Sequence, residues 1–176
     1  MIEIEKTYLA KYLPEGLEKC NSKEIFDIYI PKSSEHPKIR IRKNGDNYEI
    51  TKKVPINEDD ASQCTEHTIK ITKAEFNGMR EMDTKKVRKI RYYFEYEGRQ
   101  AEIDVFQDAL SGLVLVDFEF DSNDVKLIHT LPDFCLADVT NSEFIAGGLL
   151  AGKCYEDIED KLKSYGYKKL SLGGDL

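Results

Sequence analysis

Apolar and charged residues alternate with a period of two along several segments of the chain. In Pro37–Lys43, for example, Ile39 and Ile41 alternate with Arg40 and Arg42. Successive side chains of a β-strand point to opposite faces, so this pattern predicts a strand with one apolar and one charged face. Alternation, or a run of β-branched and aromatic residues, predicts strands at Met1–Leu9, Glu24–Ile30, Pro37–Lys43, Tyr48–Lys53, Thr65–Ile71, Val87–Tyr96, Gln100–Phe106 and Leu113–Phe120.

Short turn sequences connect several of these segments. Asn44-Gly45 and Glu97-Gly98 are typical of tight hairpin turns, so the strands on either side of each are expected to pair antiparallel. Helices are expected at Lys73–Met82, after the capping cluster Asp121–Asp124, from about Glu143, and over Tyr155–Tyr165. The predicted fold is therefore α+β: an antiparallel sheet or closed β-barrel with peripheral and C-terminal helices.

Length and composition set the wider limits. The 176 residues, 40% of them hydrophobic, suit one domain over residues 1–176, with a frayed tail at 170–176. A formal net charge of -7 argues against non-specific nucleic-acid binding, which favours basic proteins. The four cysteines lie far apart and form no CxxC pair, so free thiols in a reducing compartment are expected. No long apolar segment is present, and the expected location is the cytoplasm.

The charged face of several strands carries one sign only. The like-charged pairs are Glu3 with Glu5, Arg40 with Arg42, Lys89 with Arg91, Glu102 with Asp104, and Asp117 with Glu119. Exposed sheet faces usually mix signs, because opposite charges pair across strands and like charges repel. Two interpretations remain open. The charged faces are either solvated outer surfaces of an ordinary sheet or the inner lining of a barrel.

In the second interpretation the charges form a binding site. Basic groups from two strands, with Lys52 and Lys53 from the next hairpin strand, would surround several phosphate groups. Carboxylates from the acidic strands would hold Mg²⁺ or Mn²⁺, which prefer oxygen ligands. The metal would neutralise phosphate charge and polarise phosphorus for attack by water. A site of this kind suits a polyphosphate.

The order of these motifs resembles the CYTH, or triphosphate tunnel metalloenzyme, superfamily. The matching motifs are Glu3-x-Glu5, Arg40-x-Arg42, Thr51-x-Lys53, Lys89-x-Arg91, Glu102-x-Asp104, Asp117-x-Glu119 and Asp138-Val139-Thr140, which span nearly the whole chain. The resemblance implies an eight-stranded antiparallel tunnel in which bases bind a triphosphate and acids hold a divalent metal. The family includes inorganic and thiamine triphosphatases, class IV adenylate cyclases and RNA triphosphatases.

On this resemblance, the expected activity is metal-dependent hydrolysis of a triphosphate, with inorganic triphosphate as the leading substrate and thiamine or nucleoside triphosphates as others. Phosphate binding is assigned to Arg40, Arg42, Lys53, Lys89 and Arg91. Metal binding, with Mg²⁺ or Mn²⁺ as cofactor, is assigned to Glu3, Glu5, Asp117 and Glu119. Catalytic roles are assigned to Glu102 and Asp104, which would position a second metal or the attacking water.

Position 7 departs from the family motif Glu-x-Glu-x-Lys, because this chain has Thr7 there. Lys6 cannot substitute, since period-two alternation sends it to the opposite face. Either Lys11 or Lys52 supplies the missing charge, or the site holds phosphate less tightly and its catalysis is reduced or altered. Two alternatives to a triphosphatase stay open: an adenylate cyclase that forms cyclic AMP from ATP, and a non-catalytic binder of polyphosphate or nucleotide.

Other conspicuous side chains receive structural interpretations. The aromatic residues of Tyr92–Tyr96 are expected to pack the barrel rather than to stack on a base. The scattered histidines His36, His67 and His129 are expected at the surface or at a pocket rim. An exposed strand edge or helix could support a homodimer.

Overall fold

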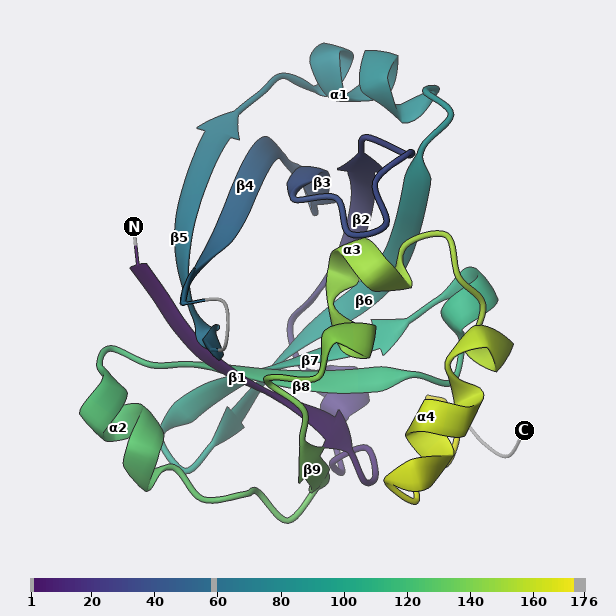
Figure 1. Cartoon of the computed structure of the whole chain (residues 1–176). Helices are drawn as coiled ribbons and strands as arrows, with labels where there is room; N and C mark the ends of the chain where they lie inside the picture. Colours follow the sequence, from purple (N-terminus) through teal and green to yellow (C-terminus); the bar gives the residue numbers. More distant parts are fainter. Residues whose placement is uncertain (1, 58–59, 173–176) are drawn as a thin grey trace.

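The computed structural model describes residues 2–57 and 60–172 (Figure 1). Its strands are β1 (Ile2–Ala10), β2 (Ser22–Ile30), β3 (Ile39–Asn44), β4 (Asn47–Asn57), β5 (Asp60–Lys70), β6 (Lys85–Tyr96), β7 (Arg99–Phe106), β8 (Val114–Glu119) and β9 (Cys135–Asp138). Its α-helices are α1 (Lys73–Arg80), α2 (Asn123–Ile128), α3 (Gly147–Leu150) and α4 (Glu159–Ser164). Short 3₁₀ turns lie at Leu17–Lys19, Asp108–Leu110, Glu143–Ile145 and Tyr155–Asp157.

The strands form a closed antiparallel barrel. Its order is β1, β8, β7, β6, β2, β3, β4 and β5, and β5 pairs back onto β1 through Ile2–Ile4. The short strand β9 pairs with the end of β1 and takes no part in the closure. Within the described residues, eight strands thus make the barrel and a ninth is attached to it, which confirms the predicted fold class.

The hairpin registers decide which charges become neighbours. Gly45, at φ 59, turns β3 into β4, because a glycine adopts a positive φ without steric cost. The resulting register places Arg42 opposite Glu49. In the next hairpin along the sheet, β6 and β7 place Arg91 opposite Asp104. Bases and acids that are separated in sequence therefore face the same side of the sheet.

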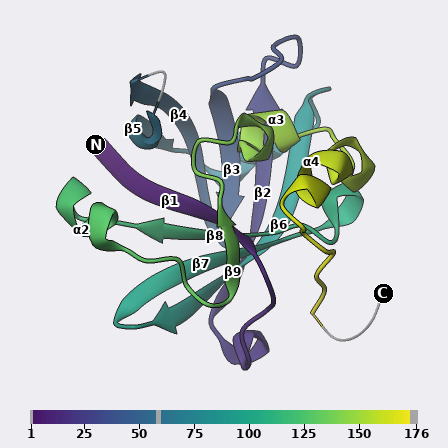
Figure 2. The same ribbon diagram turned by 60° about the horizontal axis from the view of Figure 1, so that its bottom comes forward.

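The apolar faces of the strands point outward and are covered by helices and loops. Ile28 and Ile41 pack with Phe76 of α1. Elsewhere around the barrel, Val116 of β8 packs in the same cluster as Phe134, which precedes β9. The C-terminal helices α3 and α4 instead pack in one cluster with Tyr29, Val87, Phe106 and Leu115, which line the barrel interior, and α3 lies beside β2 and β6 in Figures 1 and 2. This arrangement leaves the charged faces inside the barrel.

The C-terminal helices differ from the prediction. The helix expected from Glu143 is a 3₁₀ turn followed by the single turn α3, because Ala146 between them is extended at φ -60 and ψ 133. A Cβ on Gly147 would lie 2.1 Å from the Tyr29 hydroxyl, so only a glycine permits this close approach. The continuous helix expected over Tyr155–Tyr165 is likewise wrong, since a 3₁₀ turn precedes α4.

Three smaller predictions are also corrected. Strand β9 was not expected, because its four residues are too few to show a periodicity. The strands expected at Tyr48–Lys53 and Thr65–Ile71 are too short, because β4 ends at Asn57 and β5 begins at Asp60, while residues 58–59 lie outside the described residues. The tail is not frayed at its start, because the Leu170 N–H donates to the Gly112 carbonyl and Leu172 packs on the core. Residues 173–176 and Met1 are outside the described part.

The state of the cysteines and the lengths of the helices also bear on the predictions from the sequence. All four cysteines are free thiols, as predicted. Among the described residues, no helix has both the length and the apolar character needed to cross a membrane.

Candidate functional site

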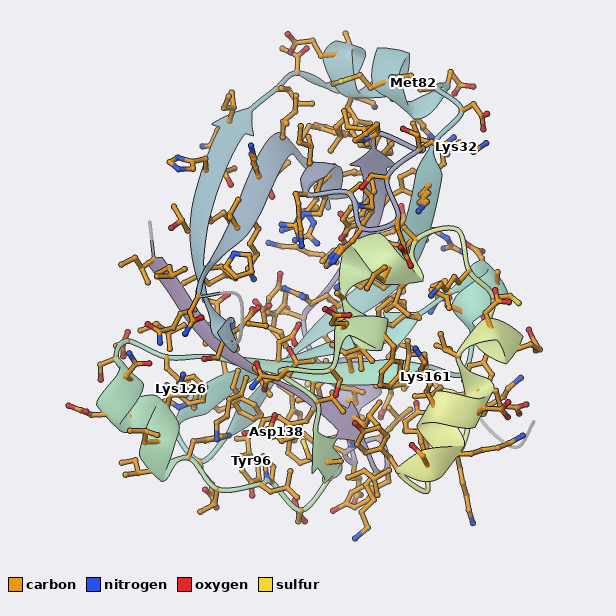
Figure 3. All side chains as sticks on the ribbon, viewed as in Figure 1. Lys32, Met82, Tyr96, Lys126, Asp138 and Lys161 are labelled. Atoms are coloured by element: carbon orange, nitrogen blue, oxygen red, sulfur yellow. The ribbon has the colours of Figure 1, made fainter. Side chains whose placement is uncertain are left out.

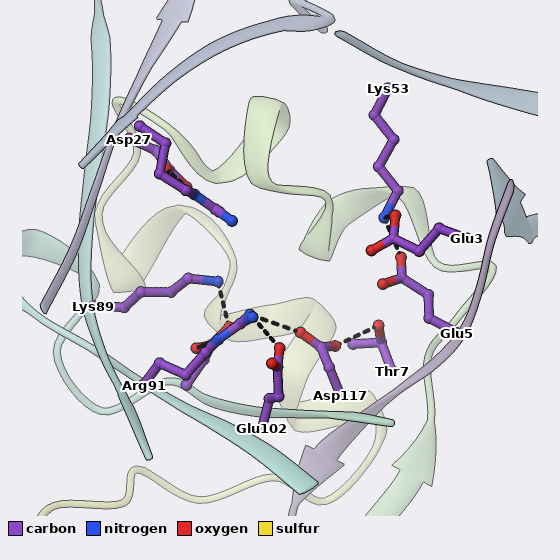
Figure 4. A network of polar contacts seen from close by, with 11 residues as sticks. Glu3, Glu5, Thr7, Asp27, Lys53, Lys89, Arg91, Glu102 and Asp117 are labelled. Atoms are coloured by element: carbon purple, nitrogen blue, oxygen red, sulfur yellow. Dashed lines mark hydrogen bonds and ion pairs between the residues drawn. The ribbon is translucent and has the colours of Figure 1, made fainter. Parts of the chain in front are cut away.

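A cavity of about 780 Å³ lies inside the barrel. All of the site residues predicted from the sequence line it: Glu3, Glu5, Arg40, Arg42, Lys53, Lys89, Arg91, Glu102, Asp104, Asp117 and Glu119. The interpretation of these faces as solvated outer surfaces is therefore wrong. Within this lining, Lys89 and Arg91 lie across the cavity from Glu3 and Glu5 (Figure 4).

The guanidinium of Arg42 is held by a buried carboxylate that sequence analysis missed. Arg42 donates from Nε to Asp27 Oδ1 and from Nη2 to Asp27 Oδ2, both at 2.7 Å, and Asp27 is 1% exposed. Burial alone would raise the pKa of Asp27, but Arg42 outweighs burial and lowers it. The clue in the sequence is one acid within an apolar strand, because a buried carboxylate needs a partner.

A second buried carboxylate, Asp104, holds the bases of β6. Arg91 donates to both of its oxygens at 2.7 Å, and Lys89 donates to Oδ2 as well. Arg91 also donates to Glu102 and, at 3.3 Å, to Asp117. Burial would raise the pKa of Asp104, yet Arg91 and Lys89 lower it below its usual range. Asp104 therefore fixes the direction of the two bases.

The opposite wall holds carboxylates around one ammonium group. Lys53 Nζ lies 2.7 Å from Glu3 Oε2 and 2.6 Å from Glu5 Oε1. Although burial lowers the pKa of Lys53, Glu5 and Glu3 outweigh burial and raise it. Burial raises the pKa of Glu5 to about 7, and Asp117 and Glu3 add to the rise. The wall carries more negative charge than Lys53 balances.

Glu119 belongs to the same group of acids. It lies opposite Glu5 in the β1–β8 register. Burial raises its pKa, and the nearby charge of Glu3 raises it further. Carboxylates crowded in this way disfavour one another's ionised form unless a cation lies among them.

Thr7 lines the cavity and is hydrogen-bonded to Asp117. Its hydroxyl donates to Asp117 Oδ1 at 2.7 Å, and its backbone N–H donates to the Thr140 hydroxyl at 3.1 Å. The proposed replacements for a lysine here are wrong, because Lys11 and Lys52 are exposed and do not line the cavity. Thr7 thus supplies a hydroxyl at a position where the family motif has a charge.

Some lining residues were not assigned to the site from the sequence. Tyr93, predicted to pack the barrel, lines the cavity instead, and Lys23 Nζ lies 5.4 Å from the centre of its ring. The clue was present, since Tyr93 continues the period-two series of Lys89 and Arg91. His36 also lines the cavity, in agreement with a rim position.

The segment after β9 adds part of the wall. Residues 140–143 and 145–148 line the cavity beside the strands. Thr140 is fixed there, because its hydroxyl donates to Asp138 Oδ1 at 2.6 Å and its N–H donates to the same oxygen at 3.0 Å. The motif Asp138-Val139-Thr140 therefore anchors the segment to the end of β1.

The donor atoms of the acidic wall suit a hard divalent cation. Glu3, Glu5, Asp117 and Glu119 offer carboxylate oxygens to the cavity, and the buried Glu3 Oε2 atom lies 2.7 Å from the Lys53 ammonium. Carboxylate oxygens are preferred ligands of Mg²⁺ and Mn²⁺. In the described part of the chain, no three acidic, imidazole or thiol groups already converge as a metal-binding group. Lys53 lies between Glu3 and Glu5, where it neutralises part of their charge.

Comparisons with known proteins agree with this architecture. No protein-family model matches the chain. A curated relative, an inorganic triphosphatase from Nitrosomonas europaea, is 28% identical over 145 residues, which are 81% of this chain and 92% of the relative.

Solved structures share the fold. The crystal structure of the inorganic triphosphatase NE1496 has a TM-score of 0.62 and 26% identity, and the match covers 85% of this chain and 93% of that one. A putative adenylate cyclase from Bacillus halodurans has a TM-score of 0.52 and 15% identity over 98% of this chain and 94% of that one, a likeness of fold alone. The charged barrel and these relatives support the resemblance of the chain to the CYTH, or triphosphate tunnel metalloenzyme, superfamily.

Proposed function

We propose that this chain hydrolyses a triphosphate inside the barrel, with inorganic triphosphate as the leading substrate. The observation that carries the proposal is one cavity of about 780 Å³ in which Lys89 and Arg91 face Glu3 and Glu5. A polyphosphate needs several cationic donors and a counter-ion at once, and this lining offers both. The curated relative that covers most of the chain is an inorganic triphosphatase.

The basic wall would bind the phosphate oxygens. Arg42, Lys89 and Arg91 are aimed by buried carboxylates, so little side-chain entropy remains to be lost when a ligand binds. Arg40 and Lys53 line the same cavity and would add further contacts. Among the described residues, the buried Arg40 Nε has no hydrogen-bond partner, and it could donate to an anion.

The acidic wall would hold Mg²⁺ or Mn²⁺ through Glu3, Glu5, Asp117 and Glu119. A divalent cation bound there supplies charge neutralisation and polarises the phosphate that is attacked. Triphosphate tunnel enzymes generally depend on such a cation. The rise in the pKa of Glu5 to about 7 shows how unfavourable its ionised form is without one.

Glu102 and Asp104 make different contacts, so we propose different roles for them. Asp104 is 1% exposed and has both oxygens bonded to bases, so we assign it the positioning of Lys89 and Arg91. Glu102 borders the cavity, and burial raises its pKa. A carboxylate with a raised pKa is a better proton acceptor, and Glu102 is our candidate for orienting the attacking water.

Substrate class and chemistry can be tested together. The purified chain is incubated with inorganic triphosphate, thiamine triphosphate or ATP, each with Mg²⁺ or with Mn²⁺, and both orthophosphate and cyclic AMP are measured. Fastest orthophosphate release from inorganic triphosphate is the expected result. Cyclic AMP from ATP would instead identify a cyclase. Tight triphosphate binding by calorimetry without product under any metal would identify a binding protein and contradict the proposal.

Replacing Lys53 with methionine is expected to raise the affinity for Mn²⁺ in the absence of substrate roughly tenfold. The reason is that the Lys53 ammonium, 2.7 Å from Glu3 and 2.6 Å from Glu5, competes with the metal for the same oxygens. Mn²⁺ binding is measured by calorimetry or by electron paramagnetic resonance.

The matched control is Lys89→Met, which also removes an ammonium from the tunnel but frees Asp104 instead of Glu3 and Glu5. Its Mn²⁺ affinity should change much less. An equal gain in both variants would show that only the overall charge matters and that Lys53 does not occupy the metal position.

We also propose that the activity takes place in the cytoplasm, because free cysteines fit a reducing compartment. Residues 1–176 would form one domain. Sedimentation of the purified chain would decide whether it forms the homodimer considered from its sequence.

A further inference from the structure

A second cavity lies outside the barrel wall, between α2 and the segment that follows β9. It measures about 530 Å³. Its lining is polar throughout: the ammonium groups of Lys6 and Lys126, the hydroxyls of Ser62, Thr140 and Ser142, the amide of Asn141, and Asp138. We call it the outer pocket. None of the roles proposed for the tunnel uses Lys6, Ser62 or Lys126.

Lys126 is the residue that most needs an explanation. It is only 9% exposed, although it lies on the short surface helix α2 (Figure 3). Its Nζ donates to the Ser62 hydroxyl, and it forms no ion pair with any described residue. A buried ammonium that meets only a neutral acceptor is unfavourable, because it has lost water without gaining a counter-charge.

The other groups of the outer pocket are mainly donors. Lys6 points outward from β1, and its Nζ lies 3.9 Å from Asp138 Oδ2, beyond hydrogen-bond distance. Asp138 is engaged elsewhere, since its Oδ1 accepts from Thr140. Asn141 uses its oxygen to accept from the Ala61 N–H at 3.0 Å, which leaves its NH₂ group as a donor.

We propose that the outer pocket binds a phosphate-type oxyanion, at a site separate from the tunnel. A tetrahedral dianion would supply the missing counter-charge of Lys126, accept from Lys6, and accept from the Asn141 amide and the Ser142 hydroxyl. A volume of about 530 Å³ has room for such an ion with its remaining water. The binding chemistry is the same for free orthophosphate and for the end of a linear polyphosphate.

The position of the pocket connects it to the tunnel. Thr140, Asn141 and Ser142 line both cavities, so one short segment separates them. Strand β1 carries Lys6 on its outer face and Glu5 and Thr7 on its inner face. An anion in the outer pocket would therefore lie directly behind the strand that supplies the acidic wall. The orthophosphate released by hydrolysis in the tunnel is an ion of this class.

The test is orthophosphate titration of the ¹⁵N-labelled chain in EDTA, followed by amide chemical shifts. We expect saturable shifts at Lys6, Ser62 and Lys126, which line the outer pocket but not the tunnel. Lys126→Met keeps the buried stem and removes the charge, and it should weaken this binding about tenfold. Shifts at tunnel residues such as Arg91 should persist, and triphosphate turnover at low orthophosphate should match that of the wild type.

Two controls keep the proposal falsifiable. Lys6→Gln changes a less buried residue and should weaken orthophosphate binding as well, even if Lys126→Met proves unstable. The proposal is overturned if orthophosphate shifts only tunnel amides, or if both variants bind it at these amides as the wild type does. A parallel titration with a long linear polyphosphate identifies the source. Tighter binding that shifts tunnel and outer amides together points to a chain end, and binding no tighter than orthophosphate points to the free ion.

Discussion

Replacing Glu5 with glutamine is expected to lower metal-dependent phosphate release by at least about 100-fold. The amide keeps the shape of the side chain but loses the charge that a divalent cation requires. Glu5 stands at the centre of the acidic wall, opposite Glu119 in register and 2.6 Å from Lys53. Turnover of inorganic triphosphate is measured at saturating Mg²⁺ and Mn²⁺, with the exposed Glu18→Gln as the matched control. Turnover of Glu5→Gln equal to that of the control would contradict the proposed metal site.

The same variant should stay folded, and its stability should depend on pH in a defined direction. The pKa of Glu5 rises from 4.5 to about 7 in the folded chain, so the folded state holds its proton more tightly than the unfolded state. The wild type therefore loses stability as pH rises from about 4.5 to 7, and glutamine at this position does not. In metal-free buffer, the melting temperature of Glu5→Gln relative to the wild type should increase from pH 5 to pH 8. If the difference in melting temperature between the two proteins stays constant with pH, the raised pKa of Glu5 is contradicted.

Replacing Asp27 with asparagine is expected to lower the free energy of unfolding by about 3–5 kcal/mol. The change removes the counter-charge of Arg42, which is buried together with Asp27 and bonded to both of its oxygens at 2.7 Å. An arginine does not lose its proton, so the folded variant must hold an unbalanced charge. Urea denaturation followed by circular dichroism measures the loss. Triphosphate affinity should fall as well, because Arg42 is no longer aimed.

Asp83→Asn is the matched control for this experiment. Lys32 and Asp83 form an ion pair at 2.6 Å, as short as that of Asp27, but their side chains are 55% and 86% exposed. Exposed pairs of this kind contribute less than about 1 kcal/mol, since water screens them. If both variants lose the same stability, burial does not determine the strength of the Asp27–Arg42 pair.

The barrel and much of the candidate site could be predicted from local patterns. Period-two alternation identifies a strand within a few residues, and the turns Asn44-Gly45 and Glu97-Gly98 set the hairpins that pair Arg42 with Glu49 and Arg91 with Asp104. Strands whose charged face carries a single sign made an inner lining one of the two interpretations open from the sequence. The predicted site residues all line one cavity, because in a closed barrel the charged faces of all these strands point to the interior.

The features that could not be predicted depend on contacts between distant parts of the chain. Asp27 is visible in the sequence as an acid within an apolar strand, but its partner Arg42 is identified only by the register of β2 and β3. The helix expected from Glu143 breaks where Gly147 meets Tyr29, a contact that no local propensity encodes. Lys53 faces the cavity whereas Lys52 faces outward, and sequence alone left this choice to family spacing.

The acidic character of the tunnel has a consequence for how a substrate arrives. Among the described residues, the carboxylates that line the cavity outnumber its lysines and arginines, and Arg42, Lys89 and Arg91 already have carboxylate partners. A bare polyphosphate therefore meets little net attraction as it approaches. A polyphosphate that carries its own divalent cation is less strongly charged and brings the ion that the carboxylates need. Association should thus be faster for the metal-laden anion than for the free one, and its rate should follow the concentration of that complex.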